Sequence, residues 1–472
     1  PMTKIRYVQG PFESSLADGL FAQNVAQGTN LMLGFQRHVT DGRFANSAYD
    51  SWQIRGRLRY NFSDRFNVSL SEFYSSSTNG MNGGIDALLS PSIYDEVTAI
   101  VRNEEASDHI SRHDVTLNGV ARLFNDSTSA TYIALYFSER DREYNDVLQS
   151  ASERTVSSLL GARLRQNLSG RSLHTAVGVD VEQARVLGGP LVGFRSENRA
   201  ALFGNLSMRV LASLQPEASV RAEQRGSASA LSYGFGLKAF LGNFPSLRGD
   251  YASSFRFSSP PPLLSVDASA AQLQFSGREK HETVALGFDL NLDSDLQLSV
   301  TAFDRSVFET FSGSIAPDSE IVYRIIPKIA SRGVAGQFSF HWWKLEGITT
   351  WIFSEMKQSP NTLTPKWSAT GEIAYRDTVL KDVMELRTGL RFRAATRHQG
   401  MQFHPRTGIY VESSGTEIES FSAIDFFLVA NLGDAYLTLS WENILNERYM
   451  TTSLYPMPGR TLRFGVNWVF ID

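Results

Sequence analysis

A strict alternation of apolar and polar side chains at the C-terminal end is the feature that most constrains this fold. In the last segment one face carries Leu462, Phe464, Val466, Trp468 and Phe470. The opposite face carries Arg463, Gly465, Asn467 and Val469. A period of two residues predicts a β-strand. An apolar face with aromatic rings near one end is typical of a strand whose outer side meets lipid.

The same alternation recurs along the whole chain, and it is clearest between residues 52 and 62. One face holds Trp52, Ile54, Gly56, Leu58, Tyr60 and Phe62, and the other holds Gln53, Arg55, Arg57, Arg59 and Asn61. An arginine facing lipid near the membrane midplane costs about 2 to 4 kcal/mol. The three arginines are therefore expected to face the interior of a barrel.

The connections between these segments alternate between tight and long. Tight polar turns are expected at 27–30, 63–64, 125–128, 169–171, 216–217, 242–245, 293–294, 344–347, 381–382 and 433–434. Longer connections are expected at 76–111, 140–152, 185–196, 259–279, 312–318, 399–417 and 444–458. This pattern predicts an all-β fold over residues 1–472, a transmembrane up-and-down antiparallel β-barrel of about 22 strands with both termini beside the short turns. A barrel of that width normally has its lumen plugged.

Composition excludes several other classes of protein. No window offers the run of about 18 apolar residues that a membrane helix needs. The net charge of −4 argues against a nucleic-acid partner. Without cysteine there is no disulfide, thiolate metal site, cysteine nucleophile or covalent c-type haem. No signal peptide is recognisable at Pro1, so export is inferred from the barrel pattern.

The C-terminal region also carries a recognisable motif. Its residues are Trp441, Asn443, Tyr449, Pro458, Gly459 and Arg460, followed by a strand with Phe470 near its end. This pattern resembles the closing end of TonB-dependent receptors, which are outer-membrane transporters of Gram-negative bacteria. The stretch Phe255-Arg256-Phe257-Ser258-Ser259-Pro260 and the strands at 282–292 and 296–305 resemble further segments of that family.

The resemblance implies a barrel in the outer membrane of a Gram-negative bacterium, with periplasmic termini, that forms a pore for uptake of a bulky solute. Two features depart from the family: Ile471 and Asp472 follow the last aromatic residue, and the N-terminal plug domain has no counterpart. The plug is expected from upstream residues or another chain, and a TonB-type energising protein would act only through it. Outer-membrane lipid and a surface lipoprotein are the other expected partners. The alternatives are a scaffold barrel in a larger outer-membrane complex and a plugless passive porin.

Charged residues on the predicted inner faces are the candidate functional residues. The basic ones are Arg55, Arg57, Arg59, Arg122, Arg163 and Arg165, and the acidic ones are Asp180, Glu182, Asp114 and Glu442. They would form either structural ion-pair ladders or an arginine-lined path for anionic solutes.

No catalytic arrangement or cofactor motif is recognisable, so we do not expect an enzyme. The acidic residues of 76–111 and the pair His109 and His113 lack a recognisable metal-ligand spacing, and a solvated loop and an ordinary strand entry are expected there.

Overall fold

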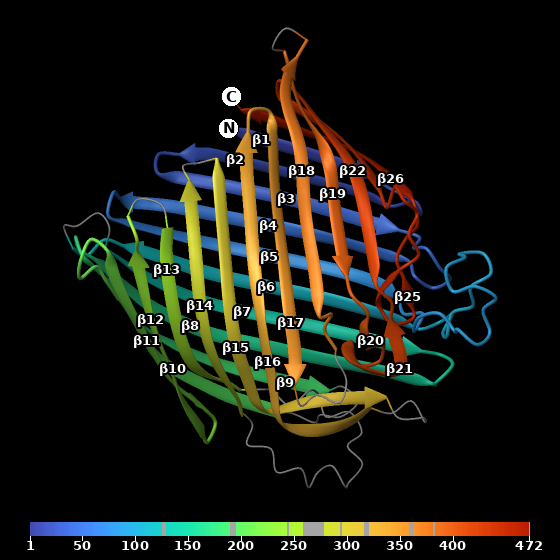
Figure 1. The fold of residues 1–472 in the computed structure, drawn as a ribbon, viewed down its shortest axis with the longest axis horizontal. Helices are drawn as coiled ribbons and strands as arrows, with labels where there is room; N and C mark the ends of the chain where they lie inside the picture. The colour runs from blue at the N-terminus through green and yellow to red at the C-terminus, as the bar shows by residue number, and fades with distance from the viewer. Residues whose placement is uncertain are drawn as a thin grey trace.

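The strands form a closed ring, as Figure 1 shows. The computed structural model describes residues 1–124, 129–188, 195–242, 245–257, 278–292, 295–315, 321–357, 363–380 and 383–471. Within these residues the ring runs from β1 through β19 to β22, β23 and β26, and back to β1, which makes 22 strands. All the ring pairings are antiparallel. The predicted fold class and strand number are confirmed.

The bounds of the first half of the strands are β1 (Met2–Gln9), β2 (Ser15–Ala26), β3 (Thr29–Thr40), β4 (Tyr49–Ser63), β5 (Phe66–Gly80), β6 (Ser107–Ala121), β7 (Ala130–Asp146), β8 (Ala151–Ser169), β9 (Leu173–Gly188), β10 (Arg195–Met208), β11 (Leu214–Arg225), β12 (Ala228–Phe240) and β13 (Pro245–Phe257). Those of the second half are β14 (Arg278–Leu292), β15 (Leu296–Ile315), β16 (Ile321–Trp342), β17 (Leu345–Lys357), β18 (Trp367–Val379), β19 (Met384–Ala395), β20 (His398–His404), β21 (Ile409–Ile418), β22 (Phe421–Leu432), β23 (Ala435–Glu442), β24 (Met450–Thr452), β25 (Tyr455–Pro456) and β26 (Thr461–Ile471).

The first and last strands close the barrel. β1 pairs with β26 from Met2 opposite Ile471 to Gln9 opposite Phe464, so neither strand leaves a free edge. The residue after the last aromatic, Ile471, takes part in this closure. Figure 1 shows the two termini side by side. They lie at the end of the barrel that carries short connections such as the one between Ala26 and Thr29.

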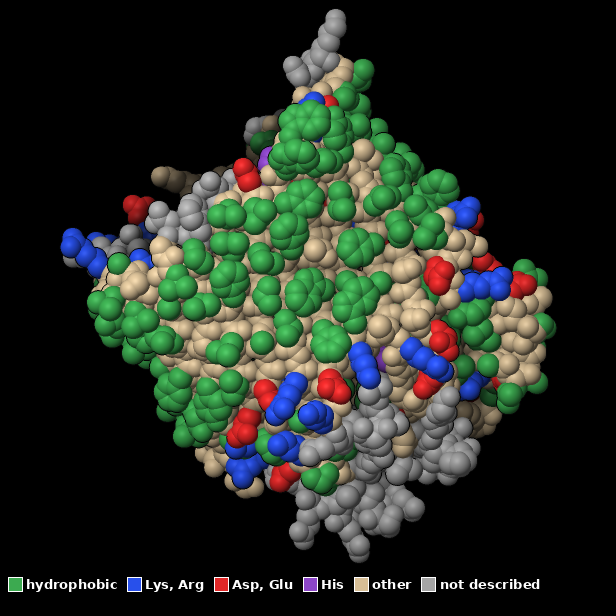
Figure 2. Space-filling view, in the orientation of Figure 1, with side chains coloured by type: hydrophobic (Ala, Val, Ile, Leu, Met, Phe, Trp, Pro, Cys, Tyr) green, Lys and Arg blue, Asp and Glu red, His purple; other side chains and the backbone are tan. Residues whose placement is uncertain are grey.

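The two faces of the wall differ as the alternation predicts. On β26, Leu462, Phe464 and Trp468 are 57%, 48% and 47% exposed, whereas the intervening residues are more covered. On β4 the arginines likewise alternate with exposed Ile54 and Leu58. Figure 2 shows hydrophobic side chains over the middle of the visible wall and charged ones gathered towards its lower margin. The exposed apolar residues therefore form an outer belt, and the arginines of β4 face the lumen.

Beyond this belt, at the end with the long connections, the outward face becomes polar. Here His113 pairs with Glu72 at 2.9 Å, and Arg154 pairs with Asp141 at 2.6 Å. Charged side chains at these outward positions would be costly in lipid. We infer that the strands extend beyond the belt at this end. That extension explains why residues 140–152, expected as a loop, are mostly strand: β7 reaches Asp146 and β8 begins at Ala151.

Two other sequence-based expectations are wrong. Residues 216–217 form part of β11, where Pro216 lies opposite Leu237, and the turn falls at 209–213. A proline near the start of a strand is tolerated because few ladder hydrogen bonds are lost there. The connection 399–417, expected to be irregular, contains the hairpin β20–β21. The turns at 125–128, 293–294 and 381–382 and most of 259–279 lie outside the described residues.

Several of the most deeply buried side chains belong to a loop cap at the same end. We define the loop cap as residues 41–48, 81–106, 396–420 and 443–460. It contains Ile85, Val411, Ile418, Asn443 and Ser453, each at most 2% exposed. Backbone hydrogen bonds join its segments, including Ile85 N–H to the Leu454 carbonyl at 2.9 Å and Ser453 N–H to the Met401 carbonyl at 2.9 Å.

Across the described residues, no helix is long and apolar enough to cross a membrane.

Candidate functional site: the lumen wall

The three arginines of β4 share the inner face of the wall. Arg55 forms an ion pair with Asp18 of β2. Arg57 and Arg59 form no ion pair within the described part of the chain, and their Nε atoms are shielded from solvent without a hydrogen-bond partner. Their neighbours in register are Met32 and Ser71 for Arg57, and Asn30 and Ser69 for Arg59. The structure therefore leaves two of the three arginines without a counter-charge.

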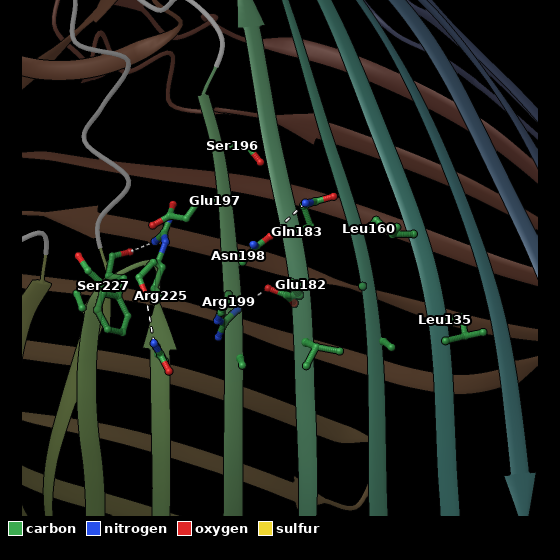
Figure 3. A pocket seen from close by; sticks show the side chains of 18 residues that line it. Leu135, Leu160, Glu182, Gln183, Ser196, Glu197, Asn198, Arg199, Arg225 and Ser227 are labelled. Atoms are coloured by element: carbon green, nitrogen blue, oxygen red, sulfur yellow. Dashed lines mark hydrogen bonds and ion pairs between the residues drawn. The ribbon is translucent and has the colours of Figure 1, made fainter.

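A ladder of ion pairs crosses the inner face of β7 to β11, and Figure 3 shows part of it. Arg163 and Arg221 both contact the carboxylate of Asp180, at 2.7 and 3.1 Å. Arg199 lies between Glu182 and Glu223, at 2.8 Å from each. The hydroxyl of Tyr136 donates to Glu182 at 2.5 Å, and Arg221 joins the two halves through Glu223 at 2.9 Å.

This ladder joins three of the candidate residues, Arg163, Asp180 and Glu182, to three that the sequence argument omitted. Arg199, Arg221 and Glu223 carry a visible signal, because Arg221 and Glu223 are two residues apart and share a strand face. Cross-strand register then supplies the contact, because Arg199 lies directly opposite Glu182. The arginines of these pairs are partly exposed while the carboxylates are largely covered, and each water-screened pair contributes about 0 to 1 kcal/mol.

The other candidate residues lie apart from the ladder. Arg165 donates from Nε to Asn167 at 2.8 Å. Arg122 follows the end of β6 and is exposed, so it is not brought to the other arginines. Asp114 pairs with Arg112 at 2.8 Å, and Glu442 pairs with Arg463 at 3.0 Å.

A second network, also absent from the sequence argument, covers the inner face of β17, β18, β19 and β22. Arg387 contacts Glu346 and Glu372, and Arg391 contacts Glu372 at 2.5 Å. Both guanidinium groups lie over the ring of Phe427, at 5.1 and 4.3 Å from its centroid. Phe427 is only 2% exposed although it faces the lumen. The aliphatic and planar parts of the arginines thus cover an aromatic ring on the inner wall.

The family-like motif builds one structural unit in the loop cap. Asn443 is 2% exposed, and its Nδ2 donates to the carbonyls of Glu447 and Pro458 at 2.9 and 3.1 Å. Its Oδ1 accepts the N–H of Glu447 at 2.8 Å, and its own N–H donates to Asp425 at 2.7 Å. These bonds fasten the loop 444–458 to the wall, so Asn443 has a structural role.

The remaining motif residues surround Asn443. Tyr449 is 4% exposed and stacks on Phe421 with ring centroids 4.5 Å apart. A side chain at Gly459 would meet Oδ1 of Asn446 at 2.7 Å, which explains the glycine. Arg460 lies over the ring of Trp441 at 5.9 Å, and Phe470 stacks on Trp468 on the lipid-facing side.

Buried cationic groups also hold the loop cap. Arg43 donates to the carbonyls of Tyr94 and Met457 at 2.7 and 2.5 Å. Burial lowers the pKa of Arg43, which stays charged because arginine titrates far above neutral pH. Arg142 contacts Asp108 at 2.7 Å and donates to the carbonyls of Pro405 and Arg406 at 2.7 and 2.9 Å. The cap is thereby tied to β6 and β7.

A hollow of about 1260 Å³ lies beside the ladder (Figure 3). It is bordered by Glu182 and Arg199 and also by Gln183 and Asn198, which bond to each other at 3.2 Å. Adjacent residues of one strand point to opposite faces of the wall. One ligand could therefore not contact both pairs, and we assign no binding site to this hollow.

No group of three or more potential metal ligands occurs among the residues that the structure describes. His109 contacts the hydroxyl of Thr78 at 3.0 Å, and His113 contacts Glu72 at 2.9 Å. Each histidine thus has its own cross-strand partner.

These features define a transmembrane-type β-barrel with an apolar outer belt and a charged inner wall. A family model described as "Putative porin" matches residues 328–472, which is less than half of the chain. Among curated proteins, no sequence matches this chain.

Solved structures show the same fold at low sequence identity. The FrpB iron transporter from Neisseria meningitidis (F3-3 variant) is 13% identical with a TM-score of 0.77, over 99% of this chain and 81% of that one. The copper transporter OprC is 13% identical with a TM-score of 0.79, over 99% and 80%. The ferric yersiniabactin uptake receptor FyuA from Yersinia pestis is 10% identical with a TM-score of 0.79, over 100% and 80%. The expected likeness to the barrels of TonB-dependent receptors is confirmed at the level of the fold.

Proposed function

We propose that this chain forms a pore in the outer membrane of a Gram-negative bacterium, with periplasmic termini, for uptake of a bulky solute. The observation that carries the proposal is the closed 22-strand ring, whose outer belt is apolar and whose inner wall is charged. A ring of that size encloses a lumen wide enough for a solute larger than those that ordinary porins pass. The transporters with the same fold support the proposal.

Such a wide lumen needs a removable plug, because an open one would leak small solutes. We propose that the plug is supplied by further residues of the same protein or by another chain. A TonB-type energising protein would then act through that plug. The arginines without counter-charges on the inner wall are consistent with a surface that contacts something else.

Liposome swelling tests the proposal. The purified barrel, reconstituted alone, is expected to let neutral oligosaccharides in rapidly, and co-reconstitution with a plug-bearing partner from native membranes should slow the swelling. An impermeable barrel that co-purifies with a tightly bound lumen polypeptide would instead indicate a scaffold. The family model described as "Putative porin" favours one further alternative. Rapid swelling with no plug-bearing partner in native pull-downs would identify a passive porin.

A further inference from the structure

The inner-wall arginines fall into two groups with different surroundings. Most of those of β8 to β11 and those of β19 are matched by carboxylates, whereas Arg165 of β8 bonds to Asn167. The inner face of β1 to β4 is different. It carries five cationic side chains, which we call the cationic wall: Lys4, Arg6, Arg55, Arg57 and Arg59.

One carboxylate, Asp18, lies on the inner face of these four strands, and it is already paired with Arg55. The neighbouring inner face of β5 adds no charge, because it presents Asn67, Ser69, Ser71, Phe73 and Ser75. Within the described residues, Lys4, Arg6, Arg57 and Arg59 form no ion pair. The excess positive charge of the cationic wall is therefore uncompensated by the wall itself.

Arg57 and Arg59 are spaced to act together. Side chains two residues apart on a strand lie about 6.8 Å apart and point to the same side. Within the described residues neither guanidinium makes a hydrogen bond or an ion pair, so the terminal nitrogens of both keep their donors for a ligand. Arginine presents its donors in a planar fork that matches a carboxylate or phosphate. Two adjacent forks suit a ligand with two anionic groups.

We propose that the cationic wall binds solutes that carry two or more phosphate or carboxylate groups during their passage. This inference rests on the proposed uptake function and names the chemical class of the solute. A monovalent ion in a wide lumen is screened within about 8 to 10 Å of the wall at physiological salt. A multivalent anion can contact both forks at once and gain charge-assisted hydrogen bonds from each. The geometry therefore favours multivalent anions over simple salts.

Calorimetric titration of the purified barrel with sodium tripolyphosphate tests the proposal, with neutral-sugar swelling measured on the same samples. Arg57→Gln/Arg59→Gln should weaken tripolyphosphate binding by about tenfold or more, since two charge-assisted contacts are lost. Arg57→Lys/Arg59→Lys keeps the charge and loses the fork, so it should show a smaller loss. Sugar swelling should be unchanged in both.

A matched control removes the same charge from the outer face. Arg37 and Arg154 pair with Asp50 and Asp141 there, at 3.0 and 2.6 Å, and Arg37→Gln/Arg154→Gln should bind tripolyphosphate like the parent chain. The proposal is overturned if Arg57→Gln/Arg59→Gln binds tripolyphosphate as tightly as the parent chain. It is also overturned if the barrel binds poly-L-glutamate but not tripolyphosphate. That second result would indicate a docking surface for an acidic polypeptide. If the glutamine variant does not fold, the tripolyphosphate affinity of Arg57→Lys/Arg59→Lys tests the proposal in its place. Swelling without tripolyphosphate binding defeats this inference alone, whereas an impermeable barrel defeats the proposed function.

Discussion

Asn443 shows how one side chain can fix a long connection. Its amide satisfies three backbone groups of loop 444–458, and its φ of 48° is a left-handed conformation that asparagine adopts more readily than most residues. Asn443→Ala should destabilise the folded barrel by about 2 to 4 kcal/mol, because buried backbone groups lose their partners. The check is urea unfolding in detergent, combined with proteolysis of the loop.

Asn443→Gly separates the two contributions. Glycine tolerates the positive φ but makes none of the side-chain hydrogen bonds. It should therefore be less destabilising than alanine, by roughly 1 kcal/mol. A loss below about 1 kcal/mol for Asn443→Ala would show that the hydrogen bonds do not hold the loop.

Ionisation of Tyr455 should destabilise the loop cap at high pH. Burial, with a smaller contribution from nearby Tyr410, raises the pKa of Tyr455 to about 12 from the usual value of 10. Tyr455 ionises first in the unfolded chain, so its contribution to stability is constant below pH 10 and falls as the pH rises from 10 to about 12. Tyr455→Phe should remove about 2 to 3 kcal/mol of this fall. Urea unfolding of the parent chain and of Tyr455→Phe across this pH range checks the prediction. An equal fall in the free energy of unfolding of the two proteins would contradict it.

At the scale of the element, the hairpin β20–β21 lies against the barrel wall. Glu412 of β21 forms a parallel bridge with Ser314 of β15, is 5% exposed and contacts the hydroxyl of Ser312. The chain has no cysteine, so Ser314→Cys/Glu412→Cys allows a single disulfide. Bridged residues meet the Cα spacing that disulfides need.

We expect this disulfide to form in oxidised protein and to leave solute swelling unchanged, since the hairpin already rests on β15. Gel mobility with and without reductant measures the cross-link, and both single-cysteine variants serve as controls. A cross-link that alters swelling would mean that the hairpin moves during solute passage.

The same hairpin shows where sequence reasoning stops. The alternation predicted the strands and faces of β4 and β26, because each wall face meets one environment along its whole length. Residues 398–404 belong to the loop cap and not to the wall, so their side chains are not divided between two solvents and no period of two appears there. The pair Arg163 and Asp180 was a visible candidate, but its contact depends on the register of β8 against β9, which no local pattern encodes. Polar outward residues such as Asp141 and Glu143 resembled a loop because the strands extend beyond the lipid belt.

At the scale of the whole molecule, the two faces of one strand should respond oppositely to the same change. On β14, Leu286 faces outward and is 66% exposed, whereas Ala285 faces the lumen opposite Asp250. Leu286→Arg should destabilise the barrel in a lipid bilayer by about 2 to 4 kcal/mol, because a charge enters hydrocarbon. Ala285→Arg places the same side chain in water beside a carboxylate and should cost under about 1 kcal/mol. Reversible unfolding from vesicles measures both.

The comparison also separates lipid effects from packing effects. Repeating both measurements in detergent micelles should shrink the cost of Leu286→Arg, since micelles admit water more readily than a bilayer, and leave Ala285→Arg unchanged. Equal costs for the two variants in vesicles would mean that the wall does not divide lipid from water. Such a result would remove the physical basis for assigning the arginines of β4 to the lumen, and with it the proposed route for the solute.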